Sequence, residues 1–538
     1  MILESKYSNS NTVDNKKVRQ ISNKLDIDYK IIQLMFLRGF KTQEQIEKFL
    51  KPTTYDLKNP YEFKDMKLVV EKIRDAIKNN KRILIFGDYD VDGMSATAIL
   101  YLHLKSLNAK VDYFLPNRYV DGYGLTKEVI DKLIERKSPE LLITVDCGIT
   151  SKDEVDYAKT KDIDVVVTDH HEEIEGKKPN CPIVNPKVKD DNYSFDSLCG
   201  AGVAFMLVEA ISGRKEAFNY IDIAALATIA DIVELKDENR AIAKLGIDKL
   251  VENPNIGLKV LSRKLKLDFN KTDLISTDIA FKIAPKINSA GRLGTPEKGL
   301  DLLITKDKKL IHTIASDLIE INEERQRLCN NIYSEAIDKL NRININNISV
   351  IVLSDSNWDA GLLGIIAARL SQEYNRPTIL FSEVGNKYKG SARSINNINI
   401  HKAIQCVDVN LDAFGGHTMA AGLTVDKKVY KKFREQTNKC VLKEFDYSDF
   451  LPRKKYDLEL SISQINIDFI KQINLLKPFG LKNEMPVFKI NFKNKNPKKM
   501  KNHPQHILFN LNNNIDLISF NDYSSDIYYN HYKNKNAL

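Results

Sequence analysis

The sequence of 538 residues lacks the features that mark membrane and secreted proteins. It holds no apolar run of about 18 residues, so it offers no candidate membrane span. The segment 1–17 is polar and has no apolar core of the signal-peptide kind. Six cysteines are scattered without a Cys-x-x-Cys pair, which predicts neither a zinc site nor a disulfide framework. Together these absences favour a cytoplasmic protein.

A strong net charge is lacking as well. The chain has 81 basic and 72 acidic residues and a formal charge of +9, which permits a polyanionic partner but does not require one. Its hydrophobic content of 43% and charged content of 28% are typical of a globular protein. The length predicts about three to four domains.

What the sequence does contain is an acidic cluster directly after an apolar run. Residues 83–86 are apolar, and Asp88, Asp90 and Asp92 follow. The run predicts a buried strand and residues 94–107 a helix, so the carboxylates stand at a strand end where α/β proteins bind ligands. Because carboxylates so close together repel one another, we expect a hard divalent cation there. A solvated acidic turn is the alternative interpretation.

The pattern recurs along the chain. A second apolar run, 141–145, ends in Asp146, and a third, 165–168, ends in Asp169, His170 and His171. An apolar helix follows, interrupted only by Asp231. Strands separated by helices predict a parallel sheet, whose rim would gather these side chains. In the histidine pair, either ring could bind a cation or orient the other.

These motifs resemble those of a known superfamily. Asp88–Gly93, Asp146 and Asp169–His171 look like the first three motifs of the DHH phosphoesterases, and Asp231 stands where the fourth belongs. Within that superfamily the chain, from about residue 52 to 521, resembles the RecJ group of single-strand-specific 5′→3′ DNA exonucleases. The resemblance implies an α/β fold with a parallel-sheet DHH domain and a second α/β, DHH-associated domain joined by a long helix. An OB-like β-barrel should follow, although we do not find its last strands in the sequence.

The domain boundaries are expected as follows. Residues 308–343 carry apolar side chains at spacings near 3.5, which predicts one long helix between two lobes. We assign a helical N-terminal segment to 1–50, the DHH domain to 51–240, a helical region with the connecting helix to 241–345, the DHH-associated domain to 346–446 and the OB-like domain to 447–538.

The resemblance also implies a catalytic centre with two divalent cations, Mn²⁺ or Mg²⁺. The expected ligands are Asp90, Asp92, Asp146, His170 and Asp231, with Asp146 between the two ions. Asp88 would support them, and His171 would be a ligand or its immediate partner. Arg292 and His417 would face the scissile phosphate. Arg292 lies in the segment 285–294, which we expect to be a loop because a basic residue stands between glycines.

The expected substrate-binding residues are Arg118, Ser391, Arg393, Gly415 and Gly416. Ser391 and Arg393 are two apart on a predicted extended segment, so they share a face and could grip one phosphate. The glycine pair lets backbone approach a phosphate closely. From the residues alone Arg118 is an ordinary surface arginine and His417 a structural loop residue, and only the resemblance gives them roles.

The sequence therefore predicts a two-metal 5′→3′ exonuclease that trims single-stranded DNA to mononucleotides in repair and recombination. An oligoribonuclease or a cyclic-dinucleotide phosphodiesterase of the same superfamily would share the four motifs but would not explain residues 452–538. A type II inorganic pyrophosphatase or a non-catalytic scaffold are further alternatives. Expected partners are single-stranded DNA, a single-strand-binding protein and a helicase, with no membrane, and the chain is expected to be a monomer.

Overall fold

The computed structural model describes residues 2–7, 13–122, 124–267, 276–395, 398–450, 453–491, 498–512 and 515–520. The chain forms two compact units. The first contains residues 1–50, 453–477 and 485–538, and the second contains residues 51–452 and 478–484. None of the helices in the described ranges combines the length and the apolarity that a membrane crossing needs.

The second unit begins with a parallel sheet of order β3-β2-β4-β5-β6, which confirms the predicted parallel α/β architecture. Gly87 pairs with Val145, and Val145 with Thr168, so three strands end side by side. The residues after these ends therefore share one rim. The strands are β2 (Ile83–Gly87), β3 (Val111–Phe114), β4 (Leu141–Val145), β5 (Asp164–Thr168) and β6 (Ile183–Val184).

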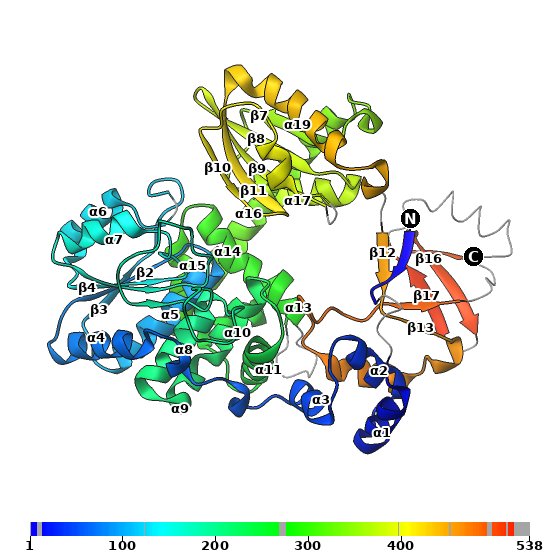
Figure 1. Cartoon of the computed structure of the whole chain (residues 1–538), viewed down its shortest axis with the longest axis horizontal. Helices are drawn as coiled ribbons and strands as arrows, with labels where there is room; N and C mark the ends of the chain where they lie inside the picture. Colours follow the sequence, from blue (N-terminus) through cyan, green and yellow to red (C-terminus); the bar gives the residue numbers. More distant parts are fainter. Residues whose placement is uncertain are drawn as a thin grey trace. The chain divides into compact units, whose positions relative to one another are not determined.

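Both faces of this sheet are covered because its apolar residues alternate between them. Ile83 and Ile85 pack into one core with helices α4 (Met66–Lys78), α5 (Val91–Ser106) and α8 (Gly200–Ser212). Leu84 and Phe86 pack into another with α6 (Lys127–Lys137) and α7 (Lys152–Lys159). Figure 1 shows these two groups of helices around the sheet. Because β2 is packed on both faces, the residues that directly follow it are held in a defined position.

A helical region leads to the second lobe of this unit. The predicted long helix is confirmed as α16 (Lys308–Leu340). Ile311 and Leu318 near its start pack into the first core, and Ala336 and Leu340 near its end into the core of the second sheet. The helices before it are α10 (Ile221–Ala230), α11 (Asp237–Glu252), α12 (Ile256–Lys264), α14 (Ala284–Arg292) and α15 (Pro296–Ile304).

The segment 285–294 is a helix for most of its length, so the predicted loop is wrong. Pro285 is the second residue of α14, which continues directly from a π-helical turn at Ile279–Ile283, where the regular α-helical hydrogen-bond ladder is already interrupted. Arg292 is the last residue of this helix. The prediction of a loop relied on the presence of proline and glycine in this segment. Both residues are compatible with a helix at the positions they occupy in α14.

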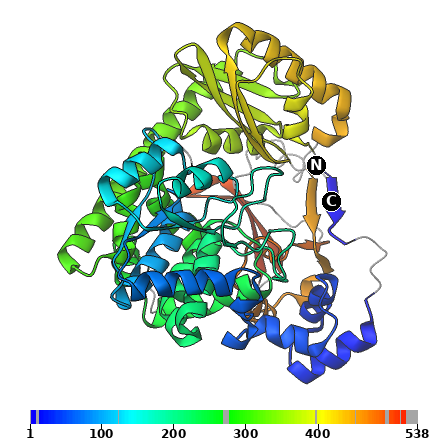
Figure 2. The same ribbon diagram turned by 60° about the vertical axis from the view of Figure 1, so that its left-hand side comes forward.

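The second lobe has a mixed sheet of order β10-β11-β9-β8-β7. Its strands are β7 (Ile351–Asp355), β8 (Thr378–Val384), β9 (Lys387–Arg393), β10 (Ala413–Gly416) and β11 (Ala420–Asp426). Helices α16 and α17 (Leu363–Tyr374) share one core with this sheet. Helices α18 (Ile400–Gln405) and α19 (Tyr430–Glu444) contribute to the other, and Figure 2 shows the lobe from a second direction.

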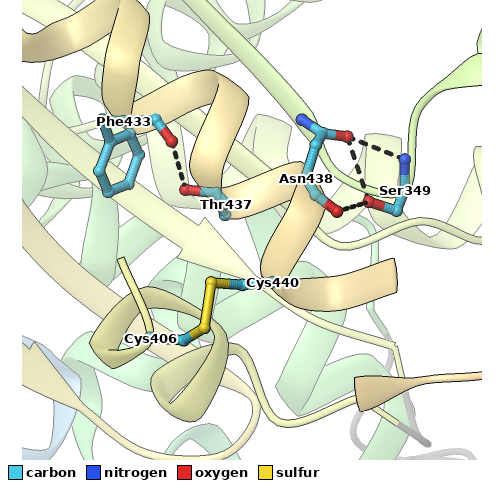
Figure 3. Close-up of a disulfide and its surroundings, with 6 residues drawn as sticks. All are labelled: Ser349, Cys406, Phe433, Thr437, Asn438 and Cys440. Atoms are coloured by element: carbon cyan, nitrogen blue, oxygen red, sulfur yellow. Dashed lines mark hydrogen bonds between the residues drawn. A yellow bond between two sulfur atoms is a disulfide. The ribbon is translucent and has the colours of Figure 1, made fainter. Parts of the chain in front are cut away.

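A disulfide joins Cys406 and Cys440 in this lobe (Figure 3), although the cysteine spacing predicted no disulfide framework. Cys406 directly follows α18, and Cys440 lies in α19. The same helix is anchored to the start of the sheet by Asn438, whose Oδ1 accepts from Ser349 N at 2.9 Å. The two cysteines are 34 residues apart, so no short spacing announced the pair.

The other unit joins the two ends of the chain. Strand β1 (Ile2–Ser5) pairs in parallel with β12 (Arg453–Tyr456). Buried Asp457 is 3.1 Å from Lys6 Nζ and 3.6 Å from Arg38 Nη2. Residues 1–50 are thus tied to the C-terminal segment. Their helices are α1 (Asn15–Leu25), α2 (Tyr29–Leu37) and α3 (Gln43–Leu50).

The C-terminal part of this unit is rich in short strands. Helix α20 (Ile467–Ile473) accompanies the strands β13 (Leu458–Leu460), β14 (Phe488–Ile490), β15 (Lys498–Met500), β16 (His503–Asn512) and β17 (Ile515–Ser519). The expectation about the last barrel strands concerns residues 521–538, which lie outside the described part of the chain. Residues 478–484 belong to the second unit, where Leu235 N donates to Leu481 O at 2.9 Å.

Candidate active site

The acidic and imidazole side chains predicted as metal-binding meet at the rim of the parallel sheet. His170 Nε2 lies 3.0 Å from Asp146 Oδ1, 3.6 Å from Asp92 Oδ2 and 3.8 Å from Asp231 Oδ2. In three groups the possible ligand atoms all lie within 4.8 Å of one another. These groups are Asp88 with Asp90 and Asp146, Asp92 with His170 and Asp231, and Asp146 with His170 and His171. Residues from four separate segments therefore converge.

The backbone holds the two aspartates of the first motif in place. Asp90 is the N-cap of α5, and its Oδ1 accepts from Asp92 N at 2.9 Å and Gly93 N at 3.1 Å. Asp92 accepts from Gly200 N at 2.6 Å and Ala201 N at 2.7 Å, at the start of α8. Helix N-termini favour negative charge, so both carboxylates are fixed before any cation binds.

Close backbone approach brings the motifs together. A Cβ on Gly93 would lie 2.5 Å from Asp88 O, and one on Gly200 would lie 2.6 Å from Asp146 Cβ. Larger residues would separate the loops at both places. Asp146 itself has a φ of 60°, a left-handed conformation that costs energy and occurs preferentially at functional sites. The centre is thus built under strain.

Burial raises the pKa values of several carboxylates at this rim, so their charged forms need a neutralising cation. Burial, then repulsion from Asp90, raises the pKa of Asp88 to about 7, and burial, then Asp92, raises that of Asp231 to about 8. Burial and Asp92 also raise the pKa of Asp90 and of Asp146. Asp146 Oδ1 is buried without a hydrogen bond in the described structure. Buried oxygens that repel one another fit a hard divalent cation.

Asp169 supports the histidines and was given no role by the sequence analysis. Its Oδ1 accepts from the backbone N–H groups of His170 and His171, and its Oδ2 accepts from Ile149 N at 2.9 Å. His171 Nδ1 lies 2.8 Å from Oδ1. Although burial opposes protonation, this contact raises the pKa of His171 to about 9. The pattern of an aspartate directly before two histidines was the available signal for this orienting role.

His170 is held as a neutral ring. Burial lowers its pKa, and this effect outweighs the attraction of Asp92. A neutral imidazole keeps a lone pair that can bind a cation.

Arg292 lies beside the first motif at the end of α14. A Cβ on the preceding Gly291 would lie 2.0 Å from Tyr89 O, so only glycine lets this helix come so close. Burial lowers the pKa of Arg292, and so does the charge of Arg118, while Asp90 opposes them. Arg118 lies over the Tyr89 ring, 5.8 Å from its centroid. Both predicted arginines therefore border the acidic rim.

A polar cradle lies on the second lobe. Arg393 Nη1 donates to Ser391 Oγ at 3.3 Å, so the two side chains share a face of β9 as predicted from their spacing. The start of α17 borders them, because a Cβ on Gly364 would lie 2.8 Å from Arg393 Nη2 and 3.1 Å from Ser391 Oγ. Gly364 was not predicted, since nothing local distinguishes it. Helix start, hydroxyl and guanidinium together suit an anion.

Tyr119 links the loop of Arg118 to the end of α14, at Arg292, and to Asp359 in the segment before α17. Its hydroxyl is 2.8 Å from Arg292 O and 3.1 Å from Asp359 Oδ2. Burial and Asp359 raise the pKa of this hydroxyl to about 12. Arg292 Nη1 also donates to Gly361 O at 3.3 Å, just before α17.

The predicted residues Gly415, Gly416 and His417 lie at a hairpin turn. Gly415 and Gly416 end β10, opposite Gly422 and Ala421 of β11. His417 is exposed, and its backbone N–H donates to Ala420 O at 2.8 Å. The geometry brings these three residues together with one another. It does not place His417 in any of the metal-suited groups of the described residues.

Comparison with known proteins identifies the family. Residues 82–231 match the DHH family N-terminal domain, 347–443 the DHHA1 domain and 456–536 the RecJ OB domain. The chain is 30% identical over 481 residues to the single-stranded-DNA-specific exonuclease RecJ of Escherichia coli, covering 85% of this chain and 82% of the relative. The chain belongs to the RecJ family. The RecJ relative from Bacillus subtilis is 34% identical over 519 residues. That alignment covers 94% of this chain but only 65% of the relative's length.

Solved structures agree with this assignment. A crystal structure of RecJ in complex with Mn²⁺ from Thermus thermophilus matches with a TM-score of 0.82 at 27% identity, covering 96% of this chain and 74% of that one. A RecJ structure in complex with Mg²⁺ from the same organism matches with a TM-score of 0.76. The DHH, DHHA1 and OB domains predicted from the sequence are thus all confirmed as domain types.

Proposed function

We propose that the chain is a metal-dependent exonuclease that hydrolyses single-stranded DNA from a 5′-phosphate end to mononucleotides, in DNA repair and recombination. The observation that carries the proposal is the convergence of Asp90, Asp92, Asp146, His170 and Asp231 at one rim. Membership of the RecJ family, whose relatives are named for single-stranded DNA, supports the substrate class.

These five residues would hold two divalent cations, Mn²⁺ or Mg²⁺, and Asp146 would serve as a ligand common to both. When bound, the pair would supply an activated water and neutralise charge on the phosphate. The chain's own contribution is to prepare the donors. Asp88 and Asp90 repel one another until a cation arrives, and Asp169 fixes His171. His170 offers a neutral ring, since burial lowers its pKa.

The basic residues would position the strand. We assign the scissile phosphate to Arg292, which is partly desolvated beside Asp90 and so binds an anion strongly. Arg118 lies close enough to act with it. His417 would donate a hydrogen bond to the same phosphate, with Gly415 and Gly416 allowing its backbone to approach. This last assignment rests on the family pattern, because His417 belongs to none of the metal-suited groups of the described residues.

The polarity would come from the cradle on β9 and α17. Ser391, Arg393 and the backbone at Gly364 form a site for a phosphate that carries extra charge. A terminal 5′-phosphate has one more ionisable oxygen than an internal phosphodiester, so such a cradle favours the strand end. Hydrolysis at the acidic rim would then release one nucleotide from that end.

The proposal extends to the cellular setting. The substrate implies work on DNA in the cytoplasm, with a single-strand-binding protein to present the strand and a helicase to open duplex. We also propose that the chain acts as a monomer. Sedimentation of the protein alone and with each partner checks these assignments.

A strand-labelling assay tests the proposal. Oligonucleotides labelled at either end, single-stranded or duplex, are incubated with Mn²⁺, with EDTA, and with the Asp90→Ala variant. We expect the 5′ label of the single strand to be released first as a mononucleotide, and no release with EDTA or the variant. Preferred hydrolysis of duplex, of RNA oligonucleotides or of cyclic dinucleotides would overturn the substrate assignment.

A further inference from the structure

A cavity of about 290 Å³ lies between α16 and α17, outside the groups assigned above. The residues of its wall that matter here are Arg325, Cys329, Tyr333, Ile365, Ile366 and Arg369. All belong to the second unit, and the helices that carry them share one core, so the cavity is part of a packed structure. Its volume is at the lower limit for small-molecule sites, which suits a single nucleotide unit.

The cavity wall holds a ready stacking surface. The guanidinium of Arg369 lies over the Tyr333 ring, 3.5 Å from its centroid. The Tyr333 hydroxyl donates to Glu373, and Arg369 Nη1 donates to Asn330 Oδ1 at 3.5 Å. These contacts fix two planar groups, the Tyr333 ring and the Arg369 guanidinium, one over the other. Such surfaces accept any base, because every base has a π-face.

Positive charge accompanies this surface. Neither Arg325 nor Arg369 forms an ion pair with a described residue, although Arg325 Nη2 donates to Asn322 Oδ1 at 2.9 Å. Arg325 Nε is buried and has no hydrogen-bond partner in the described part of the chain. Because this atom has almost no accessible surface, an anion in the cavity would meet the terminal nitrogens of the Arg325 guanidinium rather than its Nε. A phosphate is the acceptor that a guanidinium fits best.

The cavity adjoins the proposed path of the strand. Ile365 follows Gly364, which borders the cradle of Ser391 and Arg393. Burial raises the pKa of the Cys329 thiol, and the charges of Arg325 and Arg292 oppose that rise. The cavity is therefore within electrostatic reach of the arginine assigned to the scissile phosphate.

We propose that this cavity binds one nucleotide of the single strand, with its base on the Tyr333–Arg369 pair and a phosphate on Arg325. The inference rests on the proposed function and adds a second, non-catalytic contact to it. It would retain the strand between cleavage events. Loss of the contact should therefore weaken binding and leave the chemical step unchanged.

Binding of a 5′-phosphorylated oligothymidine, labelled at its 3′ end and measured by fluorescence anisotropy in EDTA, tests the inference. Arg369→Ala and Tyr333→Leu should each weaken binding about tenfold, the usual effect of losing a stacking partner. The matched control is Arg327→Ala on the same helix, since Arg327 is exposed and paired with Glu324 at 2.6 Å. It should change affinity less than about twofold.

Salt dependence separates the two contacts. Arg325→Ala should lower the slope of log affinity against log salt by about 0.7, as expected for one lost phosphate contact on a single strand. Tyr333→Leu should weaken binding without changing that slope. In nuclease assays with Mn²⁺, each variant should raise KM and leave kcat within about twofold, because uniform binding is lost. Thermal melting confirms that the variants fold.

The outcomes are distinguishable. If the wild type binds and cuts single strands while Arg325→Ala, Tyr333→Leu and Arg369→Ala behave like Arg327→Ala, this inference is wrong and the proposed function stands. A wild type that neither binds nor cuts single-stranded DNA overturns both. A fall in kcat with unchanged KM would also contradict the inference, because it would place the cavity in the chemical step.

Discussion

The two lobes of the second unit differ in the charge of their candidate sites and in the α/β sheet that carries each site. The first lobe gathers carboxylates after the ends of β2, β4 and β5, and its centre is incomplete without cations. The second lobe presents Ser391, Arg393 and the start of α17, which can bind an anion directly. In the proposed function, a phosphate would meet the cations of the first site and the guanidinium of the second. The comparison shows that the chemistry of each lobe comes from the residues at the ends and along the edges of its strands.

The lobes also differ in how strand direction creates the site. In the all-parallel first sheet, three carboxyl ends meet at one rim. In the second sheet, β9 runs antiparallel to β8 and β11, and its side chains act from the strand itself. The first site therefore depends on loops after strands, and the second on alternation along a strand.

The largest expected effect comes from Asp146→Asn. Loss of the central carboxylate should lower hydrolysis about a thousandfold or more, because metal ions supply several kcal/mol of charge stabilisation. The same change should raise the melting temperature of the metal-free protein, since it removes a buried carboxylate repelled by its neighbours. Activity assays and calorimetry in EDTA check both signs.

A matched control for that variant is Asp164→Asn at the opposite end of β5. Asp164 is exposed and pairs with Lys72 at 3.1 Å. Its substitution should change activity less than about twofold. Equal losses in both variants would mean that the rim has no special role.

We expect the folding stability of the second lobe to depend on its disulfide, whereas the activity of the first lobe depends on cations. Cys406→Ser opens a link between residues 34 apart, which should cost about 3–4 kcal/mol of stability in the chain-entropy model. Urea unfolding with and without a reducing thiol measures this loss. The control is Cys181→Ser, a half-buried free cysteine near the first sheet. A reductant that leaves the wild type unchanged would contradict the prediction.

Arg393→Ala should have the next largest effect, on end recognition. Removing a charge-assisted contact should lower the preference for 5′-phosphorylated over 5′-hydroxyl strands about 10- to 100-fold. Competition between the two strands in a single reaction gives the ratio directly. Lys389→Ala on the same strand removes an exposed positive charge and should leave the ratio intact. If both variants lose the preference, general charge rather than the cradle recognises the end.

The smallest expected effect concerns the pH dependence of stability. It comes from His103, a histidine that packs in the core and lies outside the candidate metal centre. Burial lowers the pKa of His103 in α5, against the attraction of Glu216, and His103 Nε2 lies 2.9 Å from Ser212 Oγ. Its folded-state pKa is thus below the unfolded value of about 6.5, so its contribution to stability is present above that pH and lost as pH falls. His103→Gln should remove about 1 kcal/mol or less of this acid sensitivity. Melting curves across this pH range, with exposed His312→Gln as control, check it.

Much of the site could be predicted because its signals are local. The apolar run 83–86 and the aspartates after it describe a buried strand and its rim without any tertiary information. The spacing of Ser391 and Arg393 likewise fixed their shared face. Asp92 was placed before a helix that in fact begins at Val91, a small shift because capping decides the boundary.

The rest depends on contacts that no local pattern encodes. Gly291 lies in a helix and has no side chain, so the backbone oxygen of Tyr89 can pack against it. This contact is visible only in the folded structure. Cys406 and Cys440 meet because α18 and α19 cover the same sheet. Strand β1 finds its partner β12 about 450 residues away. The start of helix α17 likewise packs against Arg393, a residue distant in sequence. Gly364 was not predicted because this contact is not visible in the local sequence.

The central claim is that one rim holds two divalent cations, and Mn²⁺ binding followed by electron paramagnetic resonance tests it most directly. The account predicts two Mn²⁺ per chain with a spin-coupled spectrum, because such ions lie about 3.5–4 Å apart in two-metal sites. Asp146→Asn should abolish the coupling. Absence of bound Mn²⁺, or one uncoupled ion that Asp146→Asn leaves unchanged, would contradict the account.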